Sequence, residues 1–347
     1  MNNAPSKFYI AFSAGVTLLL GGVLAYFLHT NIHKLPLQQN FSAEHTSAVW
    51  DWTNPMARQQ DDLEEVADLM RSRQINTVYS DISVYNDIAQ IQDEAQRAIE
   101  LKKLEDGITK YIATMNAREI RVLASAGNTD WSMPQNRRIP LAIQQFVHEY
   151  NETNETKFAG VEFDIESYNQ KGFEAASMTE KSLVLMEFLD TVDEVADRHE
   201  TYVKQSGDKD FELGFAIPYW LDNQNGNIQS VSWKDKTGPT LFHVMDRLNE
   251  LPRSNVVVMA YRDAASGNDG MIFHSRTEID YAVSRASNVD VIIGLEVTDV
   301  EPEKITFYDK SHTEMINEVK LVYDEFDKMS VFGGTAINDL EGYRSFE

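Results

Sequence analysis

Three carboxylates occupy every second position in the segment 160–166, which reads GVEFDIE. Alternate side chains of a β-strand point to the same face, so Glu162, Asp164 and Glu166 share one face and apolar residues share the other. Burying ionised carboxylates is costly, and like charges so close raise one another's pKa. The pattern therefore indicates a site for acid–base chemistry. The alternatives are a solvated edge strand and a structural ion-pair network with arginines.

A further carboxylate, Glu296, ends the apolar run 289–297, where alternation places it on the same face as Ile292 and Gly294. Retaining glycosidases use two carboxyl groups about 5–5.5 Å apart, one protonated to donate to the leaving oxygen and one ionised to attack. Alternation would place Glu296 at the same end of the sheet as Glu166. The alternative for Glu296 is an acceptor for a neighbouring backbone or arginine group.

Aromatic and short polar side chains cluster near the ends of the predicted strands. Sugar sites combine flat apolar surfaces for pyranose faces with polar groups for hydroxyls. Each aromatic residue taken alone is more often core or loop packing, but together they favour a glycan cleft. The predicted substrate-binding residues are Glu162, Trp50, Trp52, Tyr219, Trp220, Asp81 and Asn338.

Short apolar runs alternate with longer amphipathic segments along residues 48–347, which is typical of βα units around a parallel sheet. Roughly 300 residues with this pattern match the size of a (β/α)8 TIM barrel, whose active sites lie at the C-terminal ends of the strands. An open doubly wound sheet is the alternative fold. The eight predicted strands are residues 48–52, 75–82, 120–127, 158–166, 212–220, 255–262, 289–297 and 330–337.

The segment around the three carboxylates resembles the fourth strand of the family 18 glycoside hydrolases, chitinases and their relatives, which carries the pattern DGxDxDxE. Here Ala159 stands in place of the first Asp and Glu162 in place of the second. The resemblance implies that Glu166 is the proton donor and that Asp164 orients the acetamido group of the substrate.

The run VVVMAYR at 256–262 is similar to the MxYD segment of the same family. The resemblance implies that Tyr261 belongs to the substrate site, while Arg262 replaces the Asp of that segment. Glycosidase barrels of the large retaining clan are a second similarity, and they imply Glu166 as acid/base with Glu296 as nucleophile.

Composition excludes several other classes of protein. The formal charge of -24 opposes binding to nucleic acid. The chain contains no cysteine, which excludes disulfides, thiolate metal sites and a cysteine nucleophile. Neither GxGxxG nor GxxxxGK[ST] occurs, so no nucleotide and no other cofactor is predicted. The histidines form no HExxH or HxH pattern, and no metal site is predicted. A divalent ion on the three carboxylates is the alternative.

The N-terminal segment contains an uncharged apolar run from Phe8 to Leu28, long enough to cross a bilayer as one helix. We expect a cytoplasmic stub and transmembrane signal anchor over 1–34, a polar linker over 35–47 and the barrel over 48–347. A cleaved signal peptide is the alternative, but the run is longer than usual for one and no small-x-small site follows it. The predicted location is a single-pass cell-membrane protein with its C-terminal domain outside the cytoplasm.

These observations predict a membrane-anchored glycoside hydrolase that acts on a cell-envelope or extracellular polysaccharide, with Glu166 as general acid. A non-catalytic glycan-binding or envelope-assembly protein on the same barrel is the main alternative. A phosphodiester hydrolase would need cationic groups, for which Arg262 is the obvious candidate. By alternation, Arg262 should face the helices rather than the barrel interior.

Overall fold

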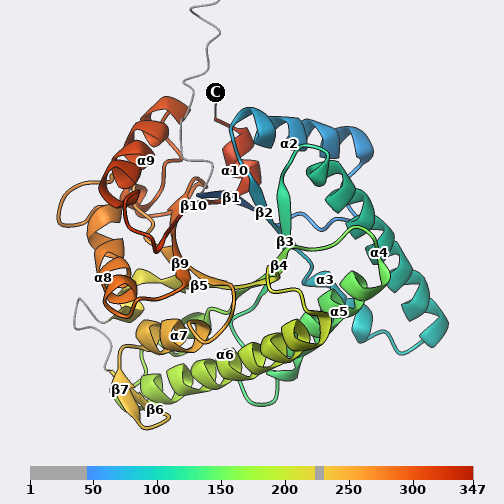
Figure 1. The fold of residues 1–347 in the computed structure, drawn as a ribbon, viewed down its shortest axis with the longest axis horizontal. Helices are drawn as coiled ribbons and strands as arrows, with labels where there is room; N and C mark the ends of the chain where they lie inside the picture. The colour runs from blue at the N-terminus through green and yellow to red at the C-terminus, as the bar shows by residue number, and fades with distance from the viewer. Residues whose placement is uncertain (1–44, 223–229, 347) are drawn as a thin grey trace, which may run out of the picture. The chain divides into compact units, whose positions relative to one another are not determined.

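Eight parallel strands close into a barrel surrounded by helices in the computed structural model, which describes residues 45–222 and 230–346 (Figure 1). The strand order around the barrel is β1-β10-β9-β8-β5-β4-β3-β2. The (β/α)8 fold is therefore confirmed, and the open sheet is excluded because β1 pairs with both β2 and β10. The barrel strands are β1 (Thr46–Asp51), β2 (Thr77–Asp81), β3 (Arg121–Gly127), β4 (Gly160–Asp164), β5 (Glu212–Pro218), β8 (Ser254–Met259), β9 (Val289–Glu296) and β10 (Phe332–Asn338).

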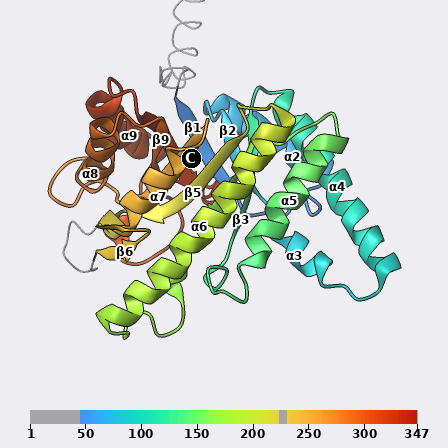
Figure 2. The same ribbon diagram turned by 60° about the horizontal axis from the view of Figure 1, so that its bottom comes forward.

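Amphipathic helices cover the outside of the barrel, and α5 and α6 lie side by side along one flank (Figure 2). Helices α6 and α9 each begin with a capping box, in which a serine and a glutamate satisfy the free backbone N–H groups of the first turn. The helices are α2 (Gln60–Ser72), α3 (Val84–Ala89), α4 (Glu94–Asn116), α5 (Arg138–Thr153), α6 (Met178–Ser206), α7 (Thr240–Leu248), α8 (Met271–Ser284), α9 (His312–Phe326) and α10 (Leu340–Arg344).

Several details differ from the sequence-based expectation. Strand β1 begins at Thr46, within the predicted linker, because its pairing with β10 starts at that residue. Strand β4 ends at Asp164, so the predicted strand 158–166 is too long at both ends. Glu166 instead precedes a short 3-10 helix, η1 (Ser167–Asn169). A small hairpin, β6 (Val231–Trp233) and β7 (Lys236–Gly238), was not predicted.

Apolar side chains from the inward faces of all the barrel strands except β4 pack together in the barrel interior. Trp50, Tyr79, Leu123, Val257 and Ile292 are among the buried residues of this cluster. The alternation predicted from sequence therefore holds in these strands, which present one apolar face inward and another toward the helices, whereas the inward face of β4 carries Glu162 and Asp164.

Close contact between β3 and β4 depends on Gly127. A Cβ atom at this position would lie 2.0 Å from the backbone oxygen of Asp164, which no side chain tolerates. Glycine therefore fixes the approach of the two strands at the residue where β4 ends.

A buried ion pair joins β1 to the helices around it. Asp51 accepts hydrogen bonds from Arg58 at 2.6 and 3.1 Å and from the Tyr111 hydroxyl of α4 at 2.8 Å. Arg58 also contacts Asp62 of α2 and Glu341 of α10. The short α10 packs against β1 and β10 and thereby closes the ring of helices next to β1.

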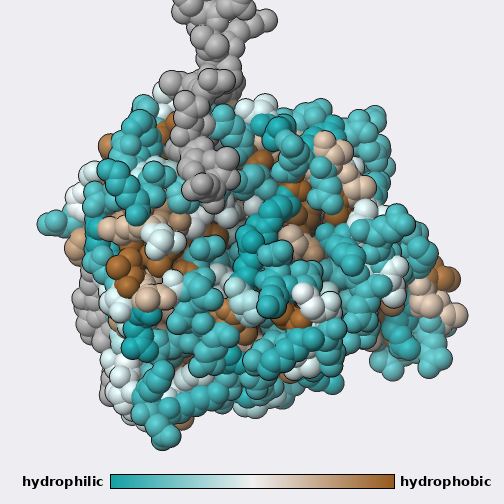
Figure 3. Space-filling view, in the orientation of Figure 1, coloured by the Kyte–Doolittle hydropathy of each residue, from teal (hydrophilic) through white to brown (hydrophobic). Residues whose placement is uncertain are grey.

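The surface of the barrel is mostly hydrophilic on the face drawn in Figure 3, with hydrophobic residues in small separate groups. Within the described residues, none of the helices has the length and apolar character needed to cross a membrane. The predicted anchor over 1–34 and most of the predicted linker lie outside the described residues.

We predict that Arg58→Met destabilises the protein by about 3–5 kcal/mol, because the substitution leaves Asp51 buried without its cationic partner. Urea unfolding monitored by circular dichroism measures the change. The matched control is Glu341→Gln, which removes a half-exposed partner of the same arginine and should cost less than about 1 kcal/mol. Equal losses in the two variants would contradict a role for the buried Asp51 pairing.

Candidate active site

A cavity of about 360 Å³ opens at the C-terminal ends of the barrel strands. Its walls bring together carboxyl groups at the ends of β4 and β9, the indole rings of Trp50 on β1 and of Trp52 just after it, and a tyrosine after β8. The residues that line it are Trp50, Trp52, Asp164, Glu166, Ala216, Met259, Tyr261, Glu296 and Asn338. Seven of these nine are residues predicted from the sequence, whose roles in a reaction stay predictions.

Glu166 stands at the rim of the β4 wall, held by two residues of η1. Its Oε1 accepts a hydrogen bond from the Tyr168 hydroxyl at 2.5 Å, and its Oε2 accepts one from the Asn169 amide at 3.0 Å. Burial raises the pKa of Tyr168 well above 10, and the charges of Glu166 and Asp164 act in the same direction. The hydroxyl therefore remains a donor and fixes the orientation of the Glu166 carboxyl group.

Asp164 lies one step deeper in the β4 wall, and its Oδ1 is buried without a hydrogen-bond partner. Burial raises the pKa of Asp164 well above its usual 3.8, with added repulsion from Glu166 and then from Glu162. A carboxyl group in this environment takes up a proton readily.

Glu162 lies beneath Asp164 and is fully buried, so it does not line the cavity. Its Oε2 accepts hydrogen bonds from the Ser125 hydroxyl at 2.7 Å and from the Trp50 indole N–H at 3.3 Å. Burial raises the pKa of Glu162 to about 7, although these hydrogen bonds act to lower it. The structure places Glu162 below the site, where it supports Trp50.

The opposite wall is built around Glu296 at the end of β9. Its Oε1 accepts hydrogen bonds from the backbone N–H groups of Val297 and Thr298 at 2.9 and 2.7 Å, and from the Thr298 hydroxyl at 2.6 Å. Its Oε2 accepts a hydrogen bond from the Asn338 amide at 2.7 Å. These four donors hold the carboxylate in one orientation.

The indole rings of Trp50 and Trp52 stack with their centres 6.4 Å apart and their planes 8° from parallel. Trp50 is buried, whereas Trp52 remains 37% exposed at the mouth. The Trp52 N–H donates a hydrogen bond to Asn338 at 2.8 Å. The outer ring therefore offers a flat, fixed surface of the kind that packs against sugar rings.

Tyr261 lies between the two walls. Burial raises the pKa of its hydroxyl well above 10, and the carboxylates Glu296, Asp164 and Glu166 add to this effect in that order. The hydroxyl is thus a protonated donor placed among groups that accept hydrogen bonds.

Besides Glu162, three predicted substrate-binding residues, Tyr219, Trp220 and Asp81, are not among the described residues that line the cavity. The Tyr219 hydroxyl accepts a hydrogen bond from Arg262 at 2.9 Å, and its ring packs on His274 of α8. Trp220 packs edge-on against Tyr168, behind the Glu166 rim. Asp81 accepts a hydrogen bond from the backbone N–H of Ser83 in a tight turn.

Arg262 points away from the cavity, as alternation predicts, and pairs with Asp269.

Sequence reasoning missed Tyr168, which holds Glu166, and Ser125, which holds Glu162. Continuing the alternation of segment 160–166 by two more residues would have drawn attention to Tyr168, whereas nothing in the sequence singled out Ser125.

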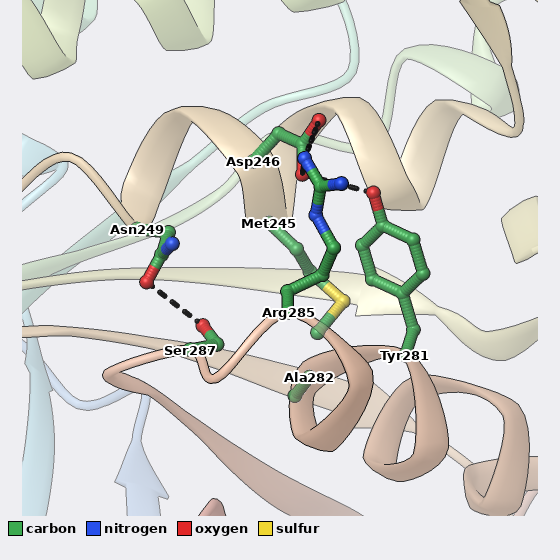
Figure 4. Close-up of a pocket in the computed structure, with 7 residues that line it drawn as sticks. All are labelled: Met245, Asp246, Asn249, Tyr281, Ala282, Arg285 and Ser287. Carbon is green, nitrogen blue, oxygen red and sulfur yellow. Dashed lines mark hydrogen bonds and ion pairs between the residues drawn. The ribbon is translucent and has the colours of Figure 1, made fainter.

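A separate surface depression lies between α7 and α8 (Figure 4). Asp246 accepts a hydrogen bond from the Tyr281 hydroxyl at 2.8 Å and pairs with Arg285 at 3.3 Å. The Ser287 hydroxyl donates to Asn249 at 3.1 Å. These polar groups pair with one another across the two helices, so the depression reflects helix packing.

The arrangement at the mouth combines a rim carboxyl group, a proton-retaining neighbour, an oriented carboxylate across the cavity and an aromatic platform. This combination suits general acid catalysis at a glycosidic bond. Among the described residues, no group of three or more His, Asp or Glu side chains is arranged to hold a metal ion.

Comparison with known proteins places the chain by fold alone. No protein-family model and no curated protein sequence matches it. A plant class V chitinase mutant from Cycas revoluta, solved in complex with (GlcNAc)3, is similar in structure with a TM-score of 0.50 and 12% identity, over 85% of this chain and 95% of that one.

Two further similar structures are also glycoside hydrolases. A family 18 chitinase from Pseudoalteromonas aurantia has a TM-score of 0.47 and 15% identity over 85% of this chain and 93% of that one. An exo-β-1,4-mannosidase from Opitutaceae bacterium strain TAV5 has a TM-score of 0.48 and 11% identity over 84% of this chain. The chain spans 51% of that mannosidase's length. The structural neighbours are thus TIM-barrel glycoside hydrolases, and at these identities they share the fold.

We predict that Glu162→Gln removes a pH-dependent loss of stability. The pKa of Glu162 is raised from 4.5 to about 7 in the folded protein. Protonation of Glu162 therefore contributes to folding stability below pH 4.5, and this contribution is lost as the pH rises through 7. The shift corresponds to about 3 kcal/mol. The glutamine keeps an oxygen for Ser125 and Trp50 without becoming charged.

Urea unfolding at several pH values between 4.5 and 8 measures the effect. The advantage of Glu162→Gln over the unsubstituted protein should grow toward pH 8. Parallel stability curves for the two proteins would show that burial does not hold a proton on Glu162.

Proposed function

We propose that this protein is a glycoside hydrolase in which Glu166 is the general acid and Glu296 the nucleophile. The observation that carries the proposal is that carboxyl groups from two distant strands, β4 and β9, line one cavity at the barrel mouth. Strands β8 and β5 separate them on one side of the ring. A glycosidic bond needs a carboxyl group on each side, one to donate a proton and one to act at the anomeric carbon.

The two carboxyl groups have surroundings suited to different roles. Glu166 lies beside Asp164, which burial and charge repulsion keep prone to protonation, so the β4 wall can store and supply a proton. Glu296 is fixed by four hydrogen-bond donors, which orient both of its oxygens as acceptors. An oriented carboxylate across from an acid is the arrangement that stabilises positive charge at the anomeric carbon.

The substrate in this proposal is a glycan of the cell envelope or the extracellular space. The stacked Trp50 and Trp52 rings support it, because an exposed indole face at the mouth suits a pyranose ring. The similar structures include a chitinase in complex with (GlcNAc)3 and a mannosidase, which makes β-linked sugars the first substrates to try.

Anchoring of the enzyme in the membrane is part of the proposal. The uncharged run from Phe8 to Leu28 supports a single span, and Lys7 just before it favours a cytoplasmic N-terminus. Digestion of intact cells or spheroplasts by added protease tests the orientation. Loss of the barrel domain under these conditions supports it, whereas protection until lysis would place the barrel inside.

The test of the activity is release of reducing ends from chitin oligomers, peptidoglycan, β-glucans and β-mannans. We expect Glu166→Gln to lower kcat by about 10²–10⁴-fold on the glycan that the unsubstituted protein cleaves, because the amide cannot donate the required proton. The matched control is Asp81→Asn, which changes another carboxylate near the strand ends that does not line the cavity.

Full activity in Glu166→Gln would remove that residue from the acid role. If neither the unsubstituted protein nor Glu166→Gln cleaves any of the glycans but both bind one, the protein is a non-catalytic glycan-binding protein on the same barrel.

A further inference from the structure

Asn338, at the end of β10, has both ends of its side-chain amide engaged by other residues of the site. Its Nδ2 donates to Glu296 Oε2 at 2.7 Å, and its Oδ1 accepts from the Trp52 indole N–H at 2.8 Å. The sequence predicted Asn338 as a sugar-binding residue. One N–H and one oxygen lone pair of the amide remain for a ligand, but their directions are fixed by the two contacts with the protein, so these contacts themselves need an explanation.

The geometry points to Asn338 as a positioning residue that links the Trp52 indole to the Glu296 carboxylate. The inference rests on the proposed function, because it treats Glu296 as a group that acts on the substrate. Trp52 fixes which way round the amide lies, since only its oxygen can accept from the indole N–H. The amide nitrogen is thereby directed toward Glu296, and it is the donor to the second oxygen of that carboxylate.

The two oxygens of Glu296 are oriented by different parts of the barrel. Val297 and Thr298 hold Glu296 Oε1 from within β9 and its following turn, so that oxygen is fixed locally. Oε2 depends on Asn338 of β10, and Asn338 depends on Trp52 beyond β1. The orientation of one carboxylate oxygen is therefore set by two neighbouring strands of the barrel.

Trp52 is the most exposed of the three residues joined by these hydrogen bonds. Its side chain remains 37% exposed, whereas Glu296 is 4% exposed. A sugar ring that packs on Trp52 would hold the indole in the orientation that directs the Asn338 amide. Occupation of the aromatic platform and alignment of Glu296 are thus coupled through a single side chain.

Two variants test the coupling on the glycan that the unsubstituted protein cleaves. Asn338→Asp replaces the amide donor by a carboxyl oxygen facing Glu296. The two carboxyl groups can form a hydrogen bond only while they share one proton, and this hydrogen bond is lost when the proton leaves as the pH rises. We expect kcat to fall at least tenfold at pH 7 and the basic limb of the pH profile to move at least one pH unit lower. Trp52→Phe keeps an aromatic face but removes the N–H, and we expect kcat to fall with KM changed less than threefold.

A sugar-binding role for Asn338 gives a different pattern. Both variants would then leave the pH profile in place, and Asn338→Asp would mainly raise KM. That result overturns the inference while leaving the proposed activity intact. The matched control is Asn288→Asp, the same substitution just before β9 at the opposite end of the barrel, which should leave the profile unchanged.

The hydrogen bonds themselves can be followed without turnover, by the indole N–H signal of Trp52 in ¹⁵N-labelled protein. We expect Asn338→Leu to speed exchange of this proton with solvent at least tenfold, and Glu296→Gln to shift the signal. An unaffected signal in both variants overturns the coupling. Clear effects in a protein that cleaves none of the glycans would refute the proposed activity but not the link between the three residues.

Discussion

The cost of removing carboxylates from water governs the centre of this molecule. Glu162, Asp164 and Glu166 follow one another up the β4 wall, and the first of them is fully buried. A barrel interior cannot hold three charges of one sign so close together, so protons are retained on the deeper groups. Hydrogen bonds from Ser125 and Trp50 act against this effect at Glu162, because they favour its charged form, but burial still raises its pKa. The rest of the barrel must be rigid enough to keep this arrangement from relaxing.

Rigidity comes from interactions on the outside of the barrel as well as from its apolar core. The Asp51–Arg58 pair, with Tyr111, ties β1 to three helices and closes the ring at its seam. Gly127 allows β3 to press against the end of β4. The two walls of the cavity then differ in kind: the β4 wall retains protons, and the β9 wall presents an oriented acceptor.

Much of the fold and part of the site followed from alternation in the sequence. Period-two patterns correctly predicted the eight strands and placed Asp164 and Glu296 on faces that line one cavity, because the side-chain direction in a strand is fixed by the backbone. Glu166 lines the same cavity from beyond the end of β4, where alternation no longer applies. The same reasoning failed for Tyr219, which turns toward α8. Its partners, Arg262 and His274, are distant in sequence and carry no local signal.

The network between Trp52, Asn338 and Glu296 was also beyond sequence reasoning, since it joins the residue after β1 to the ends of β10 and β9, and Trp52 and Asn338 are 286 positions apart. Its members were predicted one by one as site residues, but their pairing depends on the closure of the barrel. The short α10 and the β6–β7 hairpin are similar cases, in which tertiary contacts rather than local patterns stabilise a brief element.

The central claim is that Glu296 acts on the anomeric carbon opposite Glu166, and covalent trapping tests it most directly. The protein is incubated with activated 2-deoxy-2-fluoro glycosides of glucose and mannose, which form long-lived glycosyl esters with a carboxylate nucleophile, and the labelled peptide is identified by mass spectrometry. We predict an ester on Glu296 that is absent in Glu296→Gln. An ester on another carboxylate, or glycan cleavage that persists in Glu296→Gln, would contradict the account.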